Sequence, residues 1–172
     1  KVIDDRNQLQ NDGVVIIGMT IDGKTKEIVA NTDVQTRGFI YLKDSENIVR
    51  AIIEMASASG LPLVKEKKIR EANTIGTGEL IKDALDRHCQ KIYLGIGGSA
   101  TNDGGIGMAH HLGIRFLDKN HQVLEPIPEN LPFIENIDTH QLDPRIKDTQ
   151  IIVMCDVTNP LCGKTGASAI YG

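Results

Sequence analysis

The sequence contains no tryptophan, and it has only three phenylalanines and three tyrosines among 172 residues. With so few aromatic rings, the chain offers few surfaces on which nucleic-acid bases could stack. Its formal net charge of −4 at pH 7 also argues against a general binder of nucleic acid or of acidic membrane surfaces. We therefore expect the partners of this protein to be small molecules.

Long apolar runs and a secretion signal are also missing. No hydrophobic stretch approaches the roughly 20 residues of a membrane-spanning helix, and the first residues are polar. The three cysteines, Cys89, Cys155 and Cys162, lack the spacing of a metal or redox motif. They are expected to be free thiols in a reducing cytoplasm. Because the sequence starts with Lys1 rather than methionine, we also expect a segment of a longer protein.

One stretch has the spacing of a phosphate-binding P-loop but not its context. Residues 18–25 satisfy G-x-x-x-x-G-K-[ST]. A working P-loop opens directly into a helix whose N-terminus faces the phosphates. Here residues 26–30 have a strand-like pattern, and Asp22-Gly23 is typical of a hairpin turn. We interpret the match as accidental.

The first part of the chain, residues 1–50, is predicted to be a small antiparallel α+β segment. A helix is predicted from Asp44 to Met55, where apolar residues recur at helical spacing. From about Ala51 onward, alternating helices and strands predict an α/β domain with an open, mostly parallel sheet and flanking helices. Strands of the first part are indicated at residues 14–21, 26–30 and 38–42.

The second part, residues 51–172, contains three strand patterns and a helix pattern that precedes the glycine-rich stretch described below. Residues 73–78 introduce a helix with Leu80, Ile81, Ala84 and Leu85 on one face. Residues 125–148 are predicted to be a connection without chemistry. The strands are predicted at residues 92–96, 114–117 and 151–155.

The most informative stretch is Lys91 to Asp118, where a strand, a glycine-rich turn and a helix follow one another. The glycines allow positive φ and a close approach of the backbone to a ligand. The first N–H groups of the helix, with its dipole, favour a negative charge such as phosphate or carboxylate. A plain helix cap needs one polar side chain, whereas this turn has four. The predicted binding residues in it are Gly97, Gly98, Ser99, Thr101, Asn102, Gly104 and Gly105.

Two further places are candidates for the same site. Thr77 and Gly78 either begin a helix with Thr77 as its cap, or add a second anion-binding surface. Asp156 follows the strand at 151–155, at the sheet edge where ligands bind in open α/β proteins. It either faces a cleft together with Asp103 or forms a turn before Pro160.

The five histidines form no metal motif. His110 and His111 are adjacent and therefore point in different directions on a helix. They are predicted to be a core-edge and a surface histidine. No H-x-H-x-D-H motif is present.

The opening segment resembles part of the C-terminal domain of the ribonucleases J. The resemblance rests on residues 5–16, with DRNQL and DGVVI, and on residues 36–45, TRGFIYLKDS. The nuclease activity of that family belongs to a metal motif in another domain. The resemblance therefore implies a small α+β module or a fusion, without hydrolysis of RNA.

The second part contains five blocks, in order, that together match one family: residues 54–61 (EMASASGL), 76–81 (GTGELI), 95–105 (GIGGSATNDGG), 155–161 (CDVTNPL) and 166–172 (GASAIYG). In these blocks it resembles the bacterial glycerate kinases. The resemblance implies ATP-dependent phosphorylation of D-glycerate with Mg²⁺, in a cleft between two α/β domains, and here an incomplete domain. It places Asp103 and Asp156 as metal ligand and general base, in either order, and Asn159 beside the substrate or phosphate.

An alternative from another class is a non-catalytic module. In this reading a truncated or fused α/β fragment binds a small anion without turnover. A third reading, an RNA-associated fragment carried by residues 1–50, is disfavoured by the acidic charge.

Overall fold

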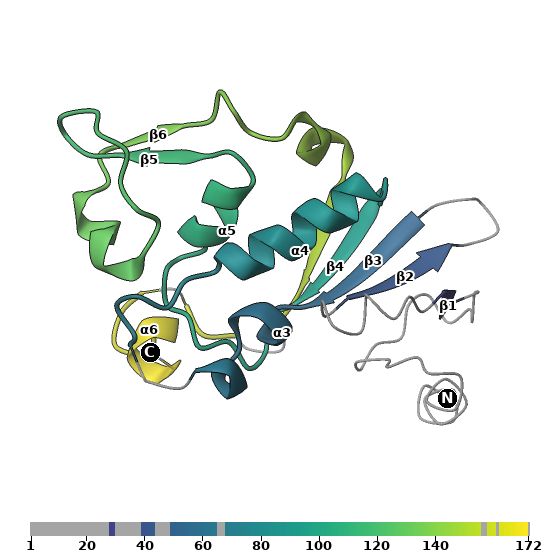
Figure 1. Ribbon diagram of the computed structural model, residues 1–172. Helices are drawn as coiled ribbons and strands as arrows, with labels where there is room; N and C mark the ends of the chain where they lie inside the picture. Colours follow the sequence, from purple (N-terminus) through teal and green to yellow (C-terminus); the bar gives the residue numbers. More distant parts are fainter. Residues whose placement is uncertain are drawn as a thin grey trace.

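The computed structural model describes residues 28–29, 39–43, 49–64, 68–155, 158–160 and 162–171. In this part of the chain, a five-stranded sheet with the order β1-β2-β3-β4-β7 is joined to a two-stranded sheet by short helices and loops (Figure 1). The strands of the large sheet are β1 (Ile28–Val29), β2 (Phe39–Lys43), β3 (Val49–Glu54), β4 (Lys91–Gly95) and β7 (Gln150–Met154).

The large sheet is antiparallel at one side and parallel at the other. Strand β3 pairs antiparallel with β2 and parallel with β4, and β4 pairs parallel with β7. Ile52 illustrates the junction, since it lies between Ile40 on β2 and Tyr93 on β4. The predicted parallel sheet and the predicted antiparallel strands are thus confirmed. They form one continuous sheet, which contains strands from both parts of the chain.

The predicted helix from Asp44 to Met55 is wrong over its described part. Residues 49–54 form β3, a central strand whose four middle residues are all buried. Its apolar run contains the β-branched residues Val49, Ile52 and Ile53, and such a short run fits a buried strand as well as a helix. The segment is a strand because it pairs with β2 on one side and with β4 on the other. Helix α3 is confined to Ala56–Ser59, before a 3-10 turn at Leu61–Leu63.

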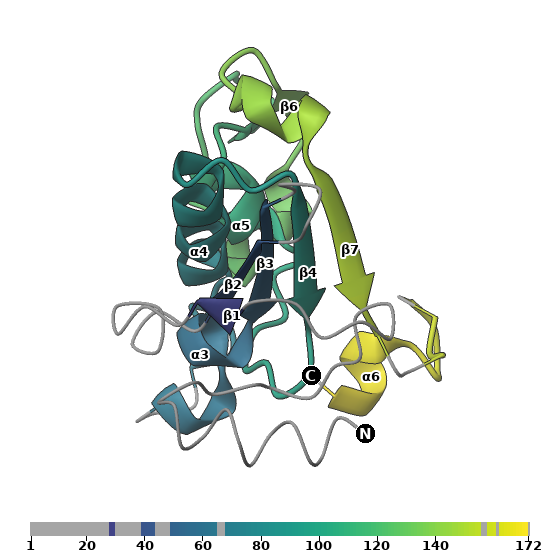
Figure 2. The ribbon, with the colours of Figure 1, turned by 90° about the vertical axis from the view of Figure 1, so that its right-hand side faces the viewer.

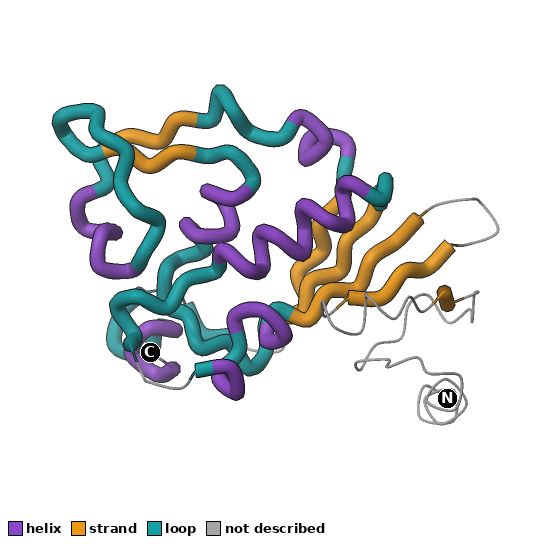
Figure 3. Tube along the Cα trace, viewed as in Figure 1, coloured by secondary structure: helices purple, strands orange, loops and turns teal. Residues whose placement is uncertain are grey.

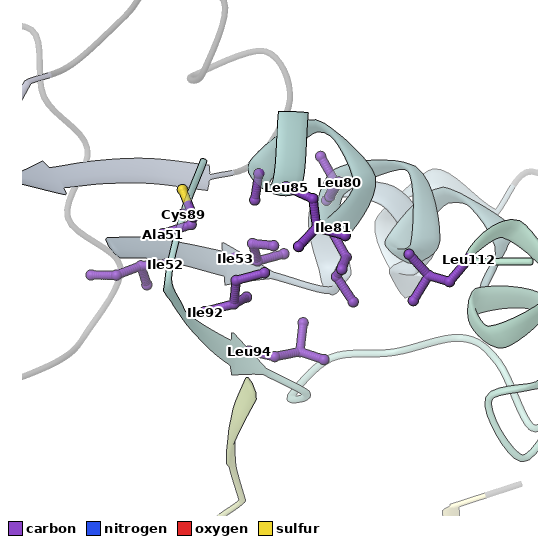
Figure 4. Close-up of a cluster of buried hydrophobic side chains, with 11 residues drawn as sticks. Ala51, Ile52, Ile53, Leu80, Ile81, Leu85, Cys89, Ile92, Leu94 and Leu112 are labelled. Atoms are coloured by element: carbon purple, nitrogen blue, oxygen red, sulfur yellow. The ribbon is translucent and has the colours of Figure 1, made fainter. Parts of the chain in front are cut away.

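Helices α4 (Ile75–Asp86) and α5 (Ile106–His111) lie together on one face of the large sheet (Figure 2). The predicted apolar face of α4 is confirmed, because its four residues pack on the buried side chains of β3 and β4 (Figure 4). Gly113 follows the end of α5 with a φ of 105°, a conformation that glycine adopts readily at helix ends. The core cluster consists of Ala51, Ile52, Ile53, Leu80, Ile81, Ala84, Leu85, Cys89, Ile92, Leu94 and Leu112.

Strand β5 (Arg115–Leu117) pairs antiparallel with β6 (Asn136–Asp138). The strand predicted at 114–117 is therefore confirmed, whereas the connection predicted at 125–148 missed β6. With only three residues, two of them polar, β6 has no strand pattern of its own and is defined by its pairing with β5. Most of the remaining chain between β5 and β7 is loop, with 3-10 turns at Pro128–Phe133 and Pro144–Asp148 (Figure 3).

Helices α3 and α6 (Ala167–Tyr171) lie near the end of the large sheet toward which β3, β4 and β7 run (Figure 2). The predicted strand at 14–21 and the P-loop-like stretch at 18–25 lie outside the described residues. Ile28–Val29 forms a strand, which agrees with the strand-like pattern that argued against a P-loop. No helix in the described part of the chain has the length and apolar character needed to cross a membrane.

Candidate functional site

The candidate site lies where the parallel strands end. Glu54, Gly95 and Met154 are the last residues of β3, β4 and β7, and they lie side by side in the sheet. The glycine-rich turn at 97–105 begins directly after β4, so its predicted position at this edge is confirmed. Asp156 follows β7 in the sequence but lies outside the described residues.

The segment after α3 holds the first half of the turn in place. Gly60 and Ser99 form an isolated antiparallel bridge. On either side of it, Leu61 N donates to Gly98 O at 3.0 Å and Ala100 N donates to Ser59 O at 2.9 Å. The two stretches that follow β3 and β4 therefore form one backbone unit at the sheet edge.

The open part of the turn is formed by glycines. Gly97, Gly98 and Gly104 are exposed, and their N–H groups donate to no other residue in the described ranges. A Cβ placed on Gly97 would meet no atom within 4 Å. Gly98 has a φ of 70° and Gly104 one of 62°, a region that other residues adopt at a cost. The turn thus has three exposed glycines whose backbone N–H groups are not used by a protein acceptor in the described ranges, as an anion site requires.

Two hydroxyl groups lie in the same turn. Ser99 Oγ and Thr101 Oγ1 are 2.7 Å apart, and Thr101 N donates to Ser99 Oγ at 3.1 Å. Both residues are half-buried. The hydroxyls are therefore held in a fixed geometry beside the exposed glycines.

Asp103 does not face the open side of the turn. Its side chain is 2% exposed, and its two carboxylate oxygens accept four hydrogen bonds from the protein. Thr74 N and Thr74 Oγ1 donate to Oδ2 at 2.8 and 2.7 Å. Gly105 N donates to Oδ1 at 2.9 Å, and Gly107 N to Oδ2 at 3.1 Å. Backbone N–H groups at the start of α5 therefore bind an anion from the chain itself. The prediction for Asp103 was a metal ligand or general base facing a cleft together with Asp156.

Thr77 and Gly78 lie inside α4, because the helix begins at Ile75. The predicted cap at Thr77 is wrong: Thr77 is fully buried, and its hydroxyl lies 2.9 Å from Ser59 Oγ. At Gly78, an added Cβ would lie 2.7 Å from His111 Cβ and 2.8 Å from Met108 O. Both residues pack α4 against its neighbours and are not presented to the exposed glycines.

The C-terminal segment folds back onto the turn. Ser168 Oγ of α6 donates to Asn102 Oδ1 at 2.9 Å. Asn159 Nδ2 donates to Thr165 O at 3.0 Å, which shapes the loop before α6. The structure thus brings Asn102 into contact with the last matching block, whereas Asn159 stabilises the approach to it.

Glu54 is a carboxylate at this edge that the sequence reasoning missed. It is half-buried, and Ser57 Oγ donates to its Oε2 at 3.3 Å. Side chains alternate along a strand, so Glu54 points away from the sheet face to which its buried neighbour Ile53 contributes. Glu54 directly follows an apolar run, and the end of a strand in a parallel sheet is where ligand-binding side chains are expected. This was missed because the run was predicted as a helix.

Other predictions concern histidines, thiols and metal. His110 is half-buried and His111 is exposed, as predicted. The three cysteines are thiols and not disulfides, also as predicted, and burial raises the pKa of the Cys89 thiol to about 12. Among the described residues, no group of three or more His, Cys, Asp or Glu side chains is arranged to hold a metal ion.

The sequence model that describes the glycerate kinase family matches residues 13–172 of the chain. The chain belongs to the glycerate kinase family. The match starts well before residue 50, so it includes most of the segment that was expected to differ from this family.

Related proteins support the same assignment. The chain is 54% identical over 124 residues to a glycerate kinase from Haemophilus influenzae, covering 71% of this chain and 33% of that protein. It is 51% identical over 124 residues to a glycerate 2-kinase from Escherichia coli, with 71% and 32% covered. A crystal structure of a putative glycerate kinase 2 from Salmonella typhimurium LT2 superimposes with a TM-score of 0.71 at 44% identity, covering 77% of this chain and 36% of that one.

The chain thus spans about a third of the length of these relatives. A smaller similarity links it to ribonuclease J 2 from Streptococcus pyogenes, which is 38% identical over 58 residues, or 34% of this chain and 10% of that protein. The resemblance to the ribonucleases J is therefore confirmed as a partial similarity.

Proposed function

We propose that this chain contributes to the ATP-dependent phosphorylation of D-glycerate to phosphoglycerate. The observation that carries the proposal is the open glycine turn at 97–105, held at the carboxyl edge of a parallel sheet in a member of the glycerate kinase family. Relatives named glycerate kinase support the substrate. The name glycerate 2-kinase favours transfer to the 2-hydroxyl group.

The chemistry of phosphoryl transfer fits such a turn. The reaction asks the protein mainly to position the reactants and to stabilise negative charge that spreads over the phosphoryl oxygens. The exposed glycines Gly97, Gly98 and Gly104 supply N–H donors without side chains that would block approach. The Ser99 and Thr101 hydroxyls, fixed by their mutual hydrogen bond, add two more polar groups beside them. We assign these five residues to the binding of phosphate or of the glycerate carboxylate.

A carboxylate is also needed, either to hold Mg²⁺ with the nucleotide phosphates or to accept the proton of the substrate hydroxyl. Glu54 fits this need, because only the Ser57 hydroxyl at 3.3 Å donates to its side chain within the described part of the chain. Asp156, which follows β7 in the sequence, is the second carboxylate of the proposal. Bound Mg²⁺ supplies neutralisation of phosphoryl charge, and it takes oxygen ligands of the kind these side chains carry.

Asn102 and Asn159 stabilise the turn and its surroundings through contacts within the protein. Asn102 connects it to α6 through Ser168, and Asn159 shapes the loop that leads there. Three cysteines that form no disulfide fit a reducing cytoplasm, which is the compartment we propose.

Coupled turnover of ATP with D-glycerate and Mg²⁺ tests this function. A variant Ser99→Ala should raise the KM for one of the two substrates, because it removes a fixed hydroxyl from the binding turn. Lys119→Ala, in the exposed turn after β5, is the matched control and should behave like the wild type. Turnover of ATP that does not depend on D-glycerate would contradict the proposed substrate.

A further inference from the structure

We infer that Asp103 is a positioning residue that acts on the reaction through Thr74, by holding the second half of the glycine turn against the start of α4. This inference rests on the proposed function, and it changes the role expected for the carboxylate. The structural basis is the junction of three segments at one buried side chain: the turn, the start of α5 and the start of α4.

The geometry leaves Asp103 little capacity for another role. A metal ligand or general base must direct a free lone pair toward the ion or the substrate proton. The Asp103 carboxylate is 2% exposed and already accepts four hydrogen bonds from three residues. Removing these donors to free a lone pair would leave several buried N–H groups without a partner. The structure therefore favours a role in which the carboxylate stays where it is.

Thr74 transmits the position of the carboxylate to both helices. Its N–H and its hydroxyl both donate to Asp103 Oδ2, and Met108 N of α5 donates to the same hydroxyl at 2.8 Å. Thr74 is itself 2% exposed. The hydroxyl thus uses its donor and an acceptor position within one buried network, which only threonine or serine can do at this site.

The network also fixes the exposed part of the turn. Asp103 lies between Thr101, whose hydroxyl belongs to the proposed binding surface, and Gly104, an exposed glycine of the same surface. A shift of Asp103 therefore moves groups on both sides that are proposed to contact the anion. A displacement of about 1 Å in such groups can cost about a hundredfold in rate.

A pair of variants at Thr74 separates positioning from direct chemistry. Thr74→Val removes the hydroxyl and leaves the Asp103 carboxylate intact, whereas Thr74→Ser keeps the hydroxyl. We expect Thr74→Val and Asp103→Asn each to lower kcat/KM by about tenfold or more at a temperature where both are folded. Thr74→Ser should stay close to the wild type. The Mg²⁺ concentration for half-maximal rate should change less than about twofold in all three variants.

Three results would overturn the inference. The first is wild-type kcat/KM in Thr74→Val together with loss of turnover in Asp103→Asn, which would give Asp103 a direct role. The second is a large increase in the Mg²⁺ requirement of Asp103→Asn, which would make it a metal ligand. The third is lower stability of both variants with unchanged kcat/KM, which would make the network merely structural. If Asp103→Asn does not fold, the Thr74 pair decides.

Failure of the proposed function is distinguishable from failure of this inference. If the wild-type chain shows no turnover, amide hydrogen exchange of residues 97–105 still tests the network. Exchange should be faster in Thr74→Val than in the wild type and unchanged in Thr74→Ser. Equal exchange in all three proteins would overturn the positioning role.

Discussion

The carboxylate of Asp103 accepts two hydrogen bonds from a single residue, Thr74, at 2.8 Å from its backbone nitrogen and 2.7 Å from its hydroxyl. These residues are 29 positions apart in the sequence. Their contact joins the loop before α4 to the turn before α5, and so the two helices that cover one face of the sheet begin at the same point. The exposed glycines extend from this point toward solvent.

Gly107 permits that contact, and its replacement should reduce stability. A Cβ at Gly107 would lie 2.8 Å from both Thr74 N and Ile75 N and 3.0 Å from Asp103 Oδ2. Gly107→Ala is therefore expected to lower the free energy of unfolding by about 1–3 kcal/mol, measured by urea denaturation. Gly97→Ala is the matched control, because its Cβ would meet no atom within 4 Å. Equal stability of the two variants would contradict the close packing at Asp103.

Replacing the Glu54 carboxylate should lower kcat without changing the stability of the fold. Glu54→Gln keeps the size of the side chain and removes its charge, and the carboxylate makes only the 3.3 Å hydrogen bond from Ser57 in the described ranges. We expect kcat to fall by about 10²-fold or more, as for loss of a general base, with the unfolding midpoint unchanged. Glu79→Gln, exposed on α4, is the control. A Glu54→Gln variant with wild-type kcat would remove Glu54 from the proposed mechanism.

Asp143 should make stability depend on pH in the acid range. Its buried carboxylate accepts hydrogen bonds from Arg145, at 2.9 Å for Nε, and from Lys82 Nζ. These partners hold the pKa of Asp143 well below its usual range. The stabilisation is therefore fully present above the unfolded pKa of about 4, and it is lost as the pH falls toward the folded pKa.

The Asp143→Asn variant tests this pH dependence. It should lose about 1.5–3 kcal/mol of unfolding free energy at pH 7, the range for hydrogen bonds to charged groups. Its stability should also fall less steeply than that of the wild type below about pH 4. Denaturant unfolding at several pH values measures both effects. Parallel curves for the two proteins would show that Asp143 is not the group responsible.

The cysteines should divide into two classes of reactivity. Cys89 is buried, with a pKa of about 12, whereas Cys155 and Cys162 are exposed. At pH 8 only about one Cys89 side chain in ten thousand is a thiolate, the form that reacts. A thiol-specific chromogenic disulfide should therefore titrate two thiols in the native protein and the third only after unfolding. Rapid reaction of all three thiols in the native protein would contradict the burial of Cys89.

Much of the site region could be predicted from local sequence. The strand, the glycine turn and α5 follow each other between Lys91 and His111, and each has a strong local signal: an apolar run, clustered glycines and then helical spacing. The apolar face of α4 was equally clear. By contrast, β3 was predicted as a helix, because Val49, Ile52 and Ile53 also satisfy helical spacing and only pairing with β2 and β4 distinguishes the two.

The role of Asp103 could not be predicted in the same way. Its sequence neighbours suggest an exposed polar turn, and the partner that buries it, Thr74, is distant in the chain. Thr77 shows the same limit, because its burial against Ser59 depends on how α4 crosses the preceding segment. A polar side chain that completes the contact between two elements has no local pattern that separates it from one that binds a ligand.

The most direct test of the central claim is ATP turnover by the chain with D-glycerate and Mg²⁺, compared between the wild type and Glu54→Gln, with Lys119→Ala as the control. We expect the wild type and the control to form phosphoglycerate, and Glu54→Gln to form it about 10²-fold or more slowly. Folded wild-type protein that binds inorganic phosphate but forms no phosphoglycerate would contradict the claim. The chain would then be an anion-binding module without catalysis.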